Sequence, residues 1–153
     1  MKKTFLLSKQ KVIDDVFIEV RAFSGDPLTK AYLTYYLCVR VSGFIEDCVR
    51  TVFSDYVDAN SKNSVKTFAI AKLKKFPNPT WSAILALTKD FDENWARQLK
   101  TKVDNSCSDA VDSIVSNRNI IAHGGSSSIT LNELEGYYRK AIQVINELEK
   151  ICV

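Results

Sequence analysis

Apolar residues recur three and four positions apart along the chain, a spacing typical of helices rather than strands. No segment alternates apolar and polar residues with the period of two expected for a strand. The first apolar stripe predicts a helix that ends near Ser24-Gly25, where small residues interrupt the pattern. Its residues are Val12, Val16, Val20 and Phe23.

A second and longer helix is predicted to start at Asp26-Pro27. An aspartate can accept the unpaired amide hydrogens of a helix start, and proline fits the first helical turn. The apolar face continues to about Val57, which corresponds to about 30 residues and roughly 45 Å of helix. The residues on this face are Val41, Ile45, Cys48, Val49, Val52 and Tyr56.

Prolines divide the middle of the chain into shorter helices. One begins at Asn60-Ser61 and is ended by Phe76-Pro77-Asn78-Pro79, since proline cannot continue a helix. Thr80 can cap the next short helix, and another short piece follows it. The apolar sides of these three helices are expected to hold Val65, Phe68, Ala69 and Leu73, then Trp81, Ile84, Leu85 and Leu87, then Trp95, Ala96 and Leu99.

Two further helices complete the pattern. The first starts near Asp104-Asn105 and stops at Gly124-Gly125, because glycine commonly follows a helix C-terminus. A short flexible loop, 126–128, precedes the second helix, which opens with Thr130 and Glu133 in a capping-box pattern. Their inward residues are Ala110, Val111, Ile114 and Val115, then Leu134, Tyr137, Tyr138, Ala141, Ile145, Leu148 and Cys152. The predicted fold class is all-α: an antiparallel helical bundle of four main helices with short helices inserted in the middle.

Length and composition fit a single domain over residues 1–153. Of the 153 residues, 46% are hydrophobic, which is enough for a core without disulfides or metals. No apolar run approaches the roughly 20 residues of a membrane helix. The stretch Phe5-Leu6-Leu7 is too short for a signal peptide, which predicts a cytoplasmic protein. The cysteines have no metal-type spacing and are expected to be small buried residues: Cys38, Cys48, Cys107 and Cys152.

The chain offers little for metal or nucleotide chemistry. His123 is its one histidine, so a two-histidine zinc motif is excluded within one subunit. No glycine-rich phosphate loop precedes a lysine, and no paired carboxylates have metal spacing. The sequence therefore predicts no cofactor and no required metal.

Positive charge is concentrated in the middle of the chain. Residues 60–102 contain nine basic and three acidic side chains, a balance of +6, whereas the whole chain carries +3. A basic region on a near-neutral body suggests a polyanion partner, with RNA the first candidate, although a solvated helix face would have the same composition. The residues predicted to contact RNA are Lys72, Lys74, Lys75, Arg97, Lys100 and Lys102.

Arg118 lies on the apolar stripe of its own helix, four residues after Ile114 and three after Val115. A guanidinium in such a place needs a carboxylate partner or a bound anion, because an uncompensated buried charge is very costly. Glu46, beside Ile45 on the second helix, is a candidate partner. One interpretation is therefore a Glu46–Arg118 pair that only stabilises the bundle.

His123 follows Arg118 by five residues, which corresponds to a rotation of about 140° on an ideal helix. The two side chains then do not share a face. Either the helix distorts before Gly124, or the two groups meet across a subunit interface. A histidine at a helix C-terminus is also explained by the helix dipole alone.

The segment Arg118-Asn119-Ile120-Ile121-Ala122-His123-Gly124, with Arg118-x4-His123 as its core, resembles the signature of HEPN-domain ribonucleases. It closes the penultimate main helix, before a capped final helix. Together with Ser42-Gly43-Phe44-Ile45-Glu46 and Phe76-Pro77-Asn78-Pro79, the pattern most resembles the RiboL-PSP-HEPN branch. The similarity is strongest over residues 30–152.

The resemblance implies a helical bundle that dimerises, with the motifs of both subunits in one cleft, and metal-independent cleavage of RNA. It implies that His123 is the general acid or base and that Arg118 holds the phosphate. Asn119 would orient the cleft or bind the phosphate, and Glu46 would position Arg118 or His123. These residue types suit the chemistry, because imidazole titrates near neutrality and guanidinium makes planar phosphate contacts.

The resemblance further implies a toxin or antiphage defence effector that acts as a homodimer and that an antitoxin or other regulatory protein could restrain. The expected products are a 2′,3′-cyclic phosphate and a 5′-hydroxyl. Some HEPN toxins carry His or Tyr two places after the histidine, where this chain has Gly125. A non-catalytic module that binds RNA, a nucleotide or a partner protein therefore stays an alternative.

Overall fold

The computed structural model describes residues 2–153, with side chains from Phe5 onward, and these residues form helices and no strand. The four long helices are α1 (Lys2–Ala22), α2 (Pro27–Asn60), α6 (Asn105–Ala122) and α7 (Leu131–Ile151). Three shorter helices lie between α2 and α6 in sequence: α3 (Asn63–Leu73), α4 (Trp81–Phe91) and α5 (Glu93–Lys102). The predicted fold class is confirmed.

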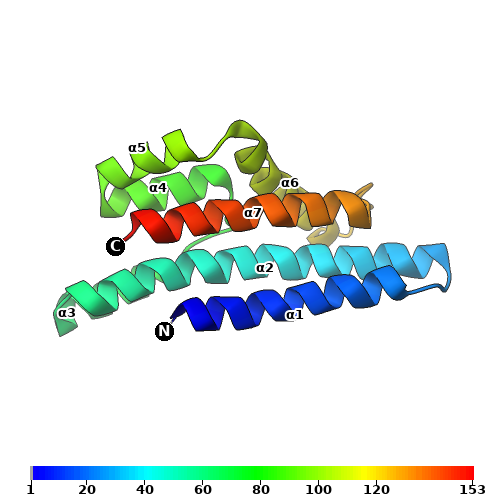
Figure 1. Ribbon diagram of the computed structural model, residues 1–153, viewed down its shortest axis with the longest axis horizontal. Coiled ribbons are helices and arrows are strands. Elements are labelled where there is room, and N and C mark those ends of the chain that lie inside the picture. The colour runs from blue at the N-terminus through cyan, green and yellow to red at the C-terminus, as the bar shows by residue number, and fades with distance from the viewer. Residues whose placement is uncertain (1) are drawn as a thin grey trace.

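The longest helix, α2, runs through the whole molecule (Figure 1). It packs against α1 on one side and against α6 and α7 on another. The pair α4 and α5 lies near the end of α7 where the chain ends, while the α6–α7 loop lies at the opposite end of α7. This arrangement separates α5 from the C-terminus of α6, which carries the candidate motif.

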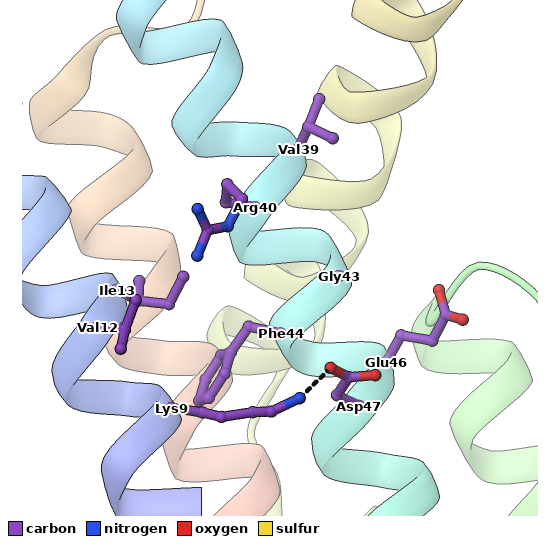
Figure 2. Close-up of a pocket in the computed structure, with 9 residues that line it drawn as sticks. All are labelled: Lys9, Val12, Ile13, Val39, Arg40, Gly43, Phe44, Glu46 and Asp47. Carbon is purple, nitrogen blue, oxygen red and sulfur yellow. Dashed lines mark hydrogen bonds and ion pairs between the residues drawn. The ribbon is translucent and has the colours of Figure 1, made fainter.

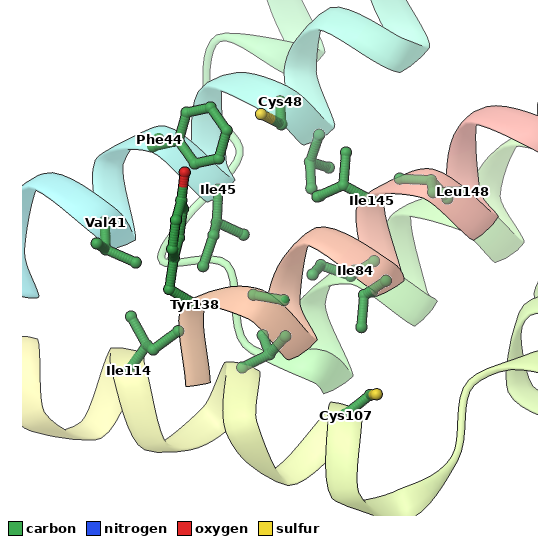
Figure 3. Close-up of a cluster of buried hydrophobic side chains, with 14 of the residues drawn as sticks. Val41, Phe44, Ile45, Cys48, Ile84, Cys107, Ile114, Tyr138, Ile145 and Leu148 are labelled. Carbon is green, nitrogen blue, oxygen red and sulfur yellow. The ribbon is translucent and has the colours of Figure 1, made fainter. Parts of the chain in front are cut away.

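The core forms where α2, α6 and α7 meet, and Figure 3 shows part of it. Val41 and Ile45 from α2, Ile114 from α6 and Leu148 from α7 are each at most 1% exposed. Tyr138 is also buried, and its hydroxyl donates a hydrogen bond to Asp14 Oδ1 at 2.8 Å. This buried hydroxyl is therefore satisfied by α1, which avoids the cost of burying an unpaired group.

Three predicted helix starts are confirmed by capping bonds. The helix predicted to open at Asn60-Ser61 instead begins at Asn63, because α2 continues to Asn60, and α2 begins at Pro27 without a capping bond from the Asp26 side chain. The Thr80 hydroxyl accepts from the amide of Ala83, and the Asp104 carboxylate accepts from the amide of Cys107. Thr130 begins α7 with both bonds of a capping box. These bonds satisfy amides that the helix itself leaves unpaired. These polar residues thus help to determine where α4, α6 and α7 begin.

Two predicted apolar faces are wrong in part, although Val20 of α1 and Leu73 of α3 are buried as predicted. In α1 the buried stripe is Leu6, Ile13, Phe17 and Val20, while Val12 is 49% exposed. This stripe faces α2, and Ile13 rather than its neighbour Val12 lies on it. In α3 only Leu73 is buried, and Val65 and Phe68 are exposed. The reason is that α3 packs mainly on α2, so most of its surface faces solvent.

All four cysteines are buried, as predicted, and none is in a disulfide. Burial raises the pKa of the Cys38 thiol to about 11 and that of the Cys48 thiol to about 12. Such thiols are inert packing groups rather than nucleophiles. Among the described residues we find no cluster of side chains suited to a metal ion, and no helix there is long and apolar enough to cross a bilayer.

Candidate active site at the end of α6

The backbone around His123 is fixed by a glycine-terminated turn. The amide of Gly124 donates to the carbonyl of Ile121 at 3.1 Å, and the amide of Gly125 donates to that of Ile120 at 2.9 Å. This pair of bonds is a Schellman motif, which requires the left-handed backbone that Gly124 adopts at φ 79°. His123 is therefore the C-cap residue of α6 and is exposed.

Arg118 and His123 lie on different faces of α6. The helix stays α-helical from Asn105 through Ala122, so the distortion considered above is not observed. Five residues then rotate the side chain by about 140°. Arg118 is half-buried and His123 is exposed. One chain thus presents the guanidinium and the imidazole in separate directions.

Asn119 links Arg118 to a turn far away in sequence. Arg118 Nη1 donates to Asn119 Oδ1 at 3.2 Å, and Asn78 Nδ2 donates to the same oxygen at 3.2 Å. Two donors occupy both lone pairs of that carbonyl oxygen. The Asn119 carboxamide can then act only as a donor toward a ligand. Beside it, the Arg118 guanidinium keeps further N–H groups, which gives a small cationic cradle suited to a phosphate.

Glu46 does not pair with Arg118, so the interpretation that a Glu46–Arg118 pair stabilises the bundle is wrong. Its carboxylate pairs at 2.6 Å with Arg50, one turn further along α2. Arg50 in turn donates to the carbonyls of Leu73 at 3.2 Å, Lys74 at 3.3 Å and Phe76 at 3.1 Å. The i,i+4 spacing of Glu46 and Arg50 favours this pair over a contact between helices. Glu46 therefore acts on the end of α3, and its connection with Arg118 is indirect.

The loop after His123 is held at its far end, which corrects the expectation of a flexible loop. The Ser127 hydroxyl donates to Asn117 Oδ1 at 2.6 Å and accepts from the amide of Ile129 at 3.0 Å. The Tyr35 hydroxyl donates to the Ser127 carbonyl at 2.5 Å. Ser127 is buried, whereas its neighbours are exposed. The exposed residues 122–126 thus lie between the last turn of α6 and the hydrogen-bonded Ser127.

The six basic residues predicted to bind RNA are all exposed, but they occupy two separate places. Lys72, Lys74 and Lys75 lie at the end of α3. Lys75 is three residues before Asn78, so its Cα lies within about 11 Å of that of Asn78. The basic end of α3 therefore lies close to the motif.

The other three predicted residues, Arg97, Lys100 and Lys102, lie on α5, which packs against α4 and α7. Lys102 lines a pocket with Gln143 and Glu147, in the second half of α7. Glu147 is sixteen residues, or about 24 Å of helix, from the start of α7 that follows the motif. The structure does not bring these three residues to the motif of the same chain.

The surface of α3 combines exposed apolar and basic side chains. Phe68 is 65% exposed, and Lys72 Nζ lies 5.6 Å from the centre of its ring. Residues 59–89 contain six lysines and no acidic residue. Lys66 forms an ion pair with Asp58, at the end of α2. The remaining charge on this surface faces solvent and is suited to an anionic partner.

A groove of about 480 Å³ lies between α1 and α2, and Figure 2 shows its lining. Lys9 crosses it to pair with Asp47 at 2.5 Å, while Glu46 points away toward the other side of α2. Glu46 is the one residue that this groove shares with the predicted site. The groove therefore belongs to the α1 side of α2 and is separate from the Arg118–Asn119 cradle.

Two residues that contact the motif network were missed from the sequence, Arg50 and Asn78. Arg50 could have been found, because Glu46 precedes it at the spacing of a helical ion pair. Asn78 had no such spacing signal. Its segment was interpreted as a helix end and as part of the family resemblance, but neither indicated a contact with Asn119, which lies 41 positions away.

Over the described residues the seven helices, in this order, are consistent with the helical bundle of a HEPN domain. The model of the RiboL-PSP-HEPN family matches residues 5–153, and the chain belongs to that family. Searches of curated proteins and of solved structures gave no significant match. HEPN domains are commonly ribonucleases.

Proposed function

We propose that this protein is a metal-independent endoribonuclease that leaves a 2′,3′-cyclic phosphate and a 5′-hydroxyl. The observation that supports this most is the Arg118–Asn119 cradle, whose free N–H groups can bind a phosphate, on the same helix as the exposed His123. In this reaction the 2′-hydroxyl attacks the adjacent phosphorus and the bond to the 5′-oxygen breaks. One base must take the first proton, and one acid must supply the second.

A dimer supplies both groups, because each chain has one imidazole. In a shared cleft, His123 of one protomer takes the 2′-proton and His123 of its partner protonates the leaving oxygen. Arg118 holds the phosphate and stabilises its developing charge. Arg118 and His123 of one chain lie on different faces of α6. In a dimer, the His123 imidazole of one chain could instead reach the Arg118–Asn119 cradle of the other.

The end of α3 is the surface that we assign to RNA within the same chain. Lys74 and Lys75 lie next to the turn that contacts Asn119. Phe68, exposed among lysines, is suited to stack on an unpaired base. The cations on α5, Arg97, Lys100 and Lys102, then contact RNA only as a second, more distant patch.

The test is incubation of RNA with purified protein in EDTA, followed by analysis of the product ends. We expect cleavage, with cyclic phosphate and 5′-hydroxyl ends. Adding increasing amounts of His123→Ala to a fixed amount of wild type tests the shared cleft. Because the proposed reaction needs the imidazoles of both chains, mixed dimers should be inactive, and cleavage should fall as wild-type dimers exchange into mixed ones. Products with 5′-phosphate ends would contradict the proposed reaction.

A cellular role as a toxin or antiphage defence effector follows from this activity, restrained by an antitoxin or other regulatory protein. Expression of the wild type should arrest growth, and expression of His123→Ala should not. Equal growth with both would remove the toxin assignment and leave the enzymatic proposal in place.

The second candidate is a non-catalytic module that binds RNA, a nucleotide or a protein. It is favoured by Gly125, where some HEPN toxins have His or Tyr. A Cβ at this position would lie 2.9 Å from Ile120 Cγ2 and 3.1 Å from the Ile120 carbonyl, so a side chain there would require Ile120 to shift. Salt-dependent RNA binding without cleavage, unaffected by His123→Ala, would support this candidate.

A further inference from the structure

The turn that joins α3 to α4 is unusually constrained. Asn78 stands between Pro77 and Pro79, whose rings fix two backbone angles. Phe76 is only 7% exposed, and Pro79 is also buried. The Asn78 carbonyl accepts a hydrogen bond from the amide of Thr80 at 2.8 Å. The Asn78 side chain is therefore presented by a backbone with little freedom.

Arg50 fixes the other end of this turn. Its guanidinium donates to three carbonyls at the end of α3, those of Leu73, Lys74 and Phe76. Glu46 holds Arg50 from one turn earlier on α2. The long central helix is thus connected through Arg50 to the turn, and through Asn78 to the candidate phosphate site.

The bond from Asn78 determines which way the Asn119 carboxamide faces. Without this donor, the amide could rotate and direct its oxygen outward, where it would repel a phosphate. With Asn78 and Arg118 both donating to Oδ1, the Nδ2 group is directed away from the turn. A donor that is already oriented costs no reorganisation when the phosphate gains charge.

We propose that Asn78 is a positioning residue for the Arg118–Asn119 phosphate site, and that Arg50, held by Glu46, fixes the turn that carries it. This inference rests on the proposed function, since it concerns how that site binds phosphate. It also gives Glu46 a role different from a direct contact with Arg118 or His123.

The first test compares Asn78→Ala with Thr80→Ala, two residues away in the same turn. Asn78→Ala should lower kcat/KM for RNA about five- to tenfold with little change in Tm, the size expected for one orienting hydrogen bond. Thr80→Ala removes the cap of α4, so it should lower Tm by about 2–4 °C and leave kcat/KM unchanged. The reverse pattern would overturn the proposal, because it would make Asn78 a purely structural residue.

A double-mutant cycle tests whether Asn78 acts through Asn119. In the Asn119→Ala background, Asn78→Ala should cause no further loss of kcat/KM, since the group that it orients is absent. A further loss of five- to tenfold would show that Asn78 acts by another route and would overturn the proposal.

Binding of inorganic phosphate separates this inference from the proposed function. In the 1H–15N spectrum of the full-length wild type, phosphate should shift the side-chain amide of Asn119, and Asn78→Ala should weaken this binding about fivefold. If the wild type cuts no RNA but this difference is seen, the proposed function fails and the positioning role stands. Equal phosphate affinity in wild type and Asn78→Ala would overturn the positioning role, whatever the RNA assay gives.

Discussion

The α1–α7 side of the bundle and the α3–α6 side use their charged residues differently. On the first side, basic residues meet carboxylates: Lys9 pairs with Asp47, and Arg21 and Arg139 both pair with Glu135. On the second side Lys66 also pairs with Asp58, but Arg118 bonds to an amide instead of a carboxylate. The difference indicates that a basic side chain paired with a carboxylate stabilises the fold, while one without such a partner is available to a ligand.

Arginine substitutions on the two sides should give the clearest contrast. Arg118→Ala should reduce RNA cleavage at least about 100-fold, because it removes the main cationic donor to the phosphate, and should leave Tm nearly unchanged. Arg21→Ala removes the pair with Glu135 and a bond to Asn132, so it should lower Tm by up to about 4 °C with normal cleavage. Rate assays and thermal melts of both variants test this prediction. Equal effects on the cleavage rate would contradict the proposed difference between the two sides.

Lysines at the end of α3 should matter for RNA affinity more than paired lysines elsewhere. Lys74→Ala with Lys75→Ala should weaken binding about tenfold or more. It should also reduce the slope of log affinity against log salt by about 1.4, as expected for two lost phosphate contacts on a single strand. The control is Lys11→Ala with Lys150→Ala, two exposed lysines that pair with carboxylates. Fluorescence anisotropy over a salt series measures both, and an identical slope change in the control would contradict the assignment.

Exposed apolar residues on the two sides should also differ. Phe68 on α3 and Ile18 on α1 are 65% and 66% exposed. Phe68→Ala should weaken binding of single-stranded RNA about fivefold or more, since stacking on an aromatic ring contributes about 1–3 kcal/mol per base. Ile18→Ala should leave RNA binding unchanged. If Phe68→Ala instead halves the mass in solution, this face is a contact between chains and the stacking assignment is wrong.

The smallest effect is expected from the pH dependence of stability on the α1–α7 side. The hydrogen bond from Arg139, together with the charge of Arg21, holds the pKa of Glu135 below its usual value. A depressed carboxyl pKa stabilises the folded protein above the unfolded pKa, and this stabilisation is lost as the pH falls below about 4. Thermal melts at pH 3–7 should show a shallower acid loss for Glu135→Gln than for wild type. Equal slopes would show that the pair contributes nothing.

Several helix boundaries were predictable because their signals are local, although α3 begins at Asn63 rather than at Asn60-Ser61. Thr130 and Glu133 form the capping box that their spacing indicated, and Asp104 caps α6. Such bonds connect residues three positions apart, so a sequence displays them directly. The position of Arg118 and His123 at the end of a long helix was predictable for the same reason.

What could not be predicted depends on how helices cross. The buried stripe of α1 includes Ile13 rather than Val12, and α3 exposes Phe68, because the packing angle and the number of neighbours decide which face is covered. The contact of Asn78 with Asn119 likewise depends on the path of the chain between α3 and α4. No spacing within either segment indicates this contact. The predicted Glu46–Arg118 pair was wrong for another reason: Glu46 has a nearer partner in Arg50.

The most direct test of the account is the ratio of RNA cleavage rates of wild type and His123→Ala, measured in EDTA on samples of equal Tm. His123 is exposed at the end of α6, so the substitution should leave the fold intact. We expect the variant to be at least about 100-fold slower, the contribution of a general acid or base. Equal cleavage by the two proteins, or no cleavage by a dimeric wild type, would contradict the assignment of catalysis to this motif.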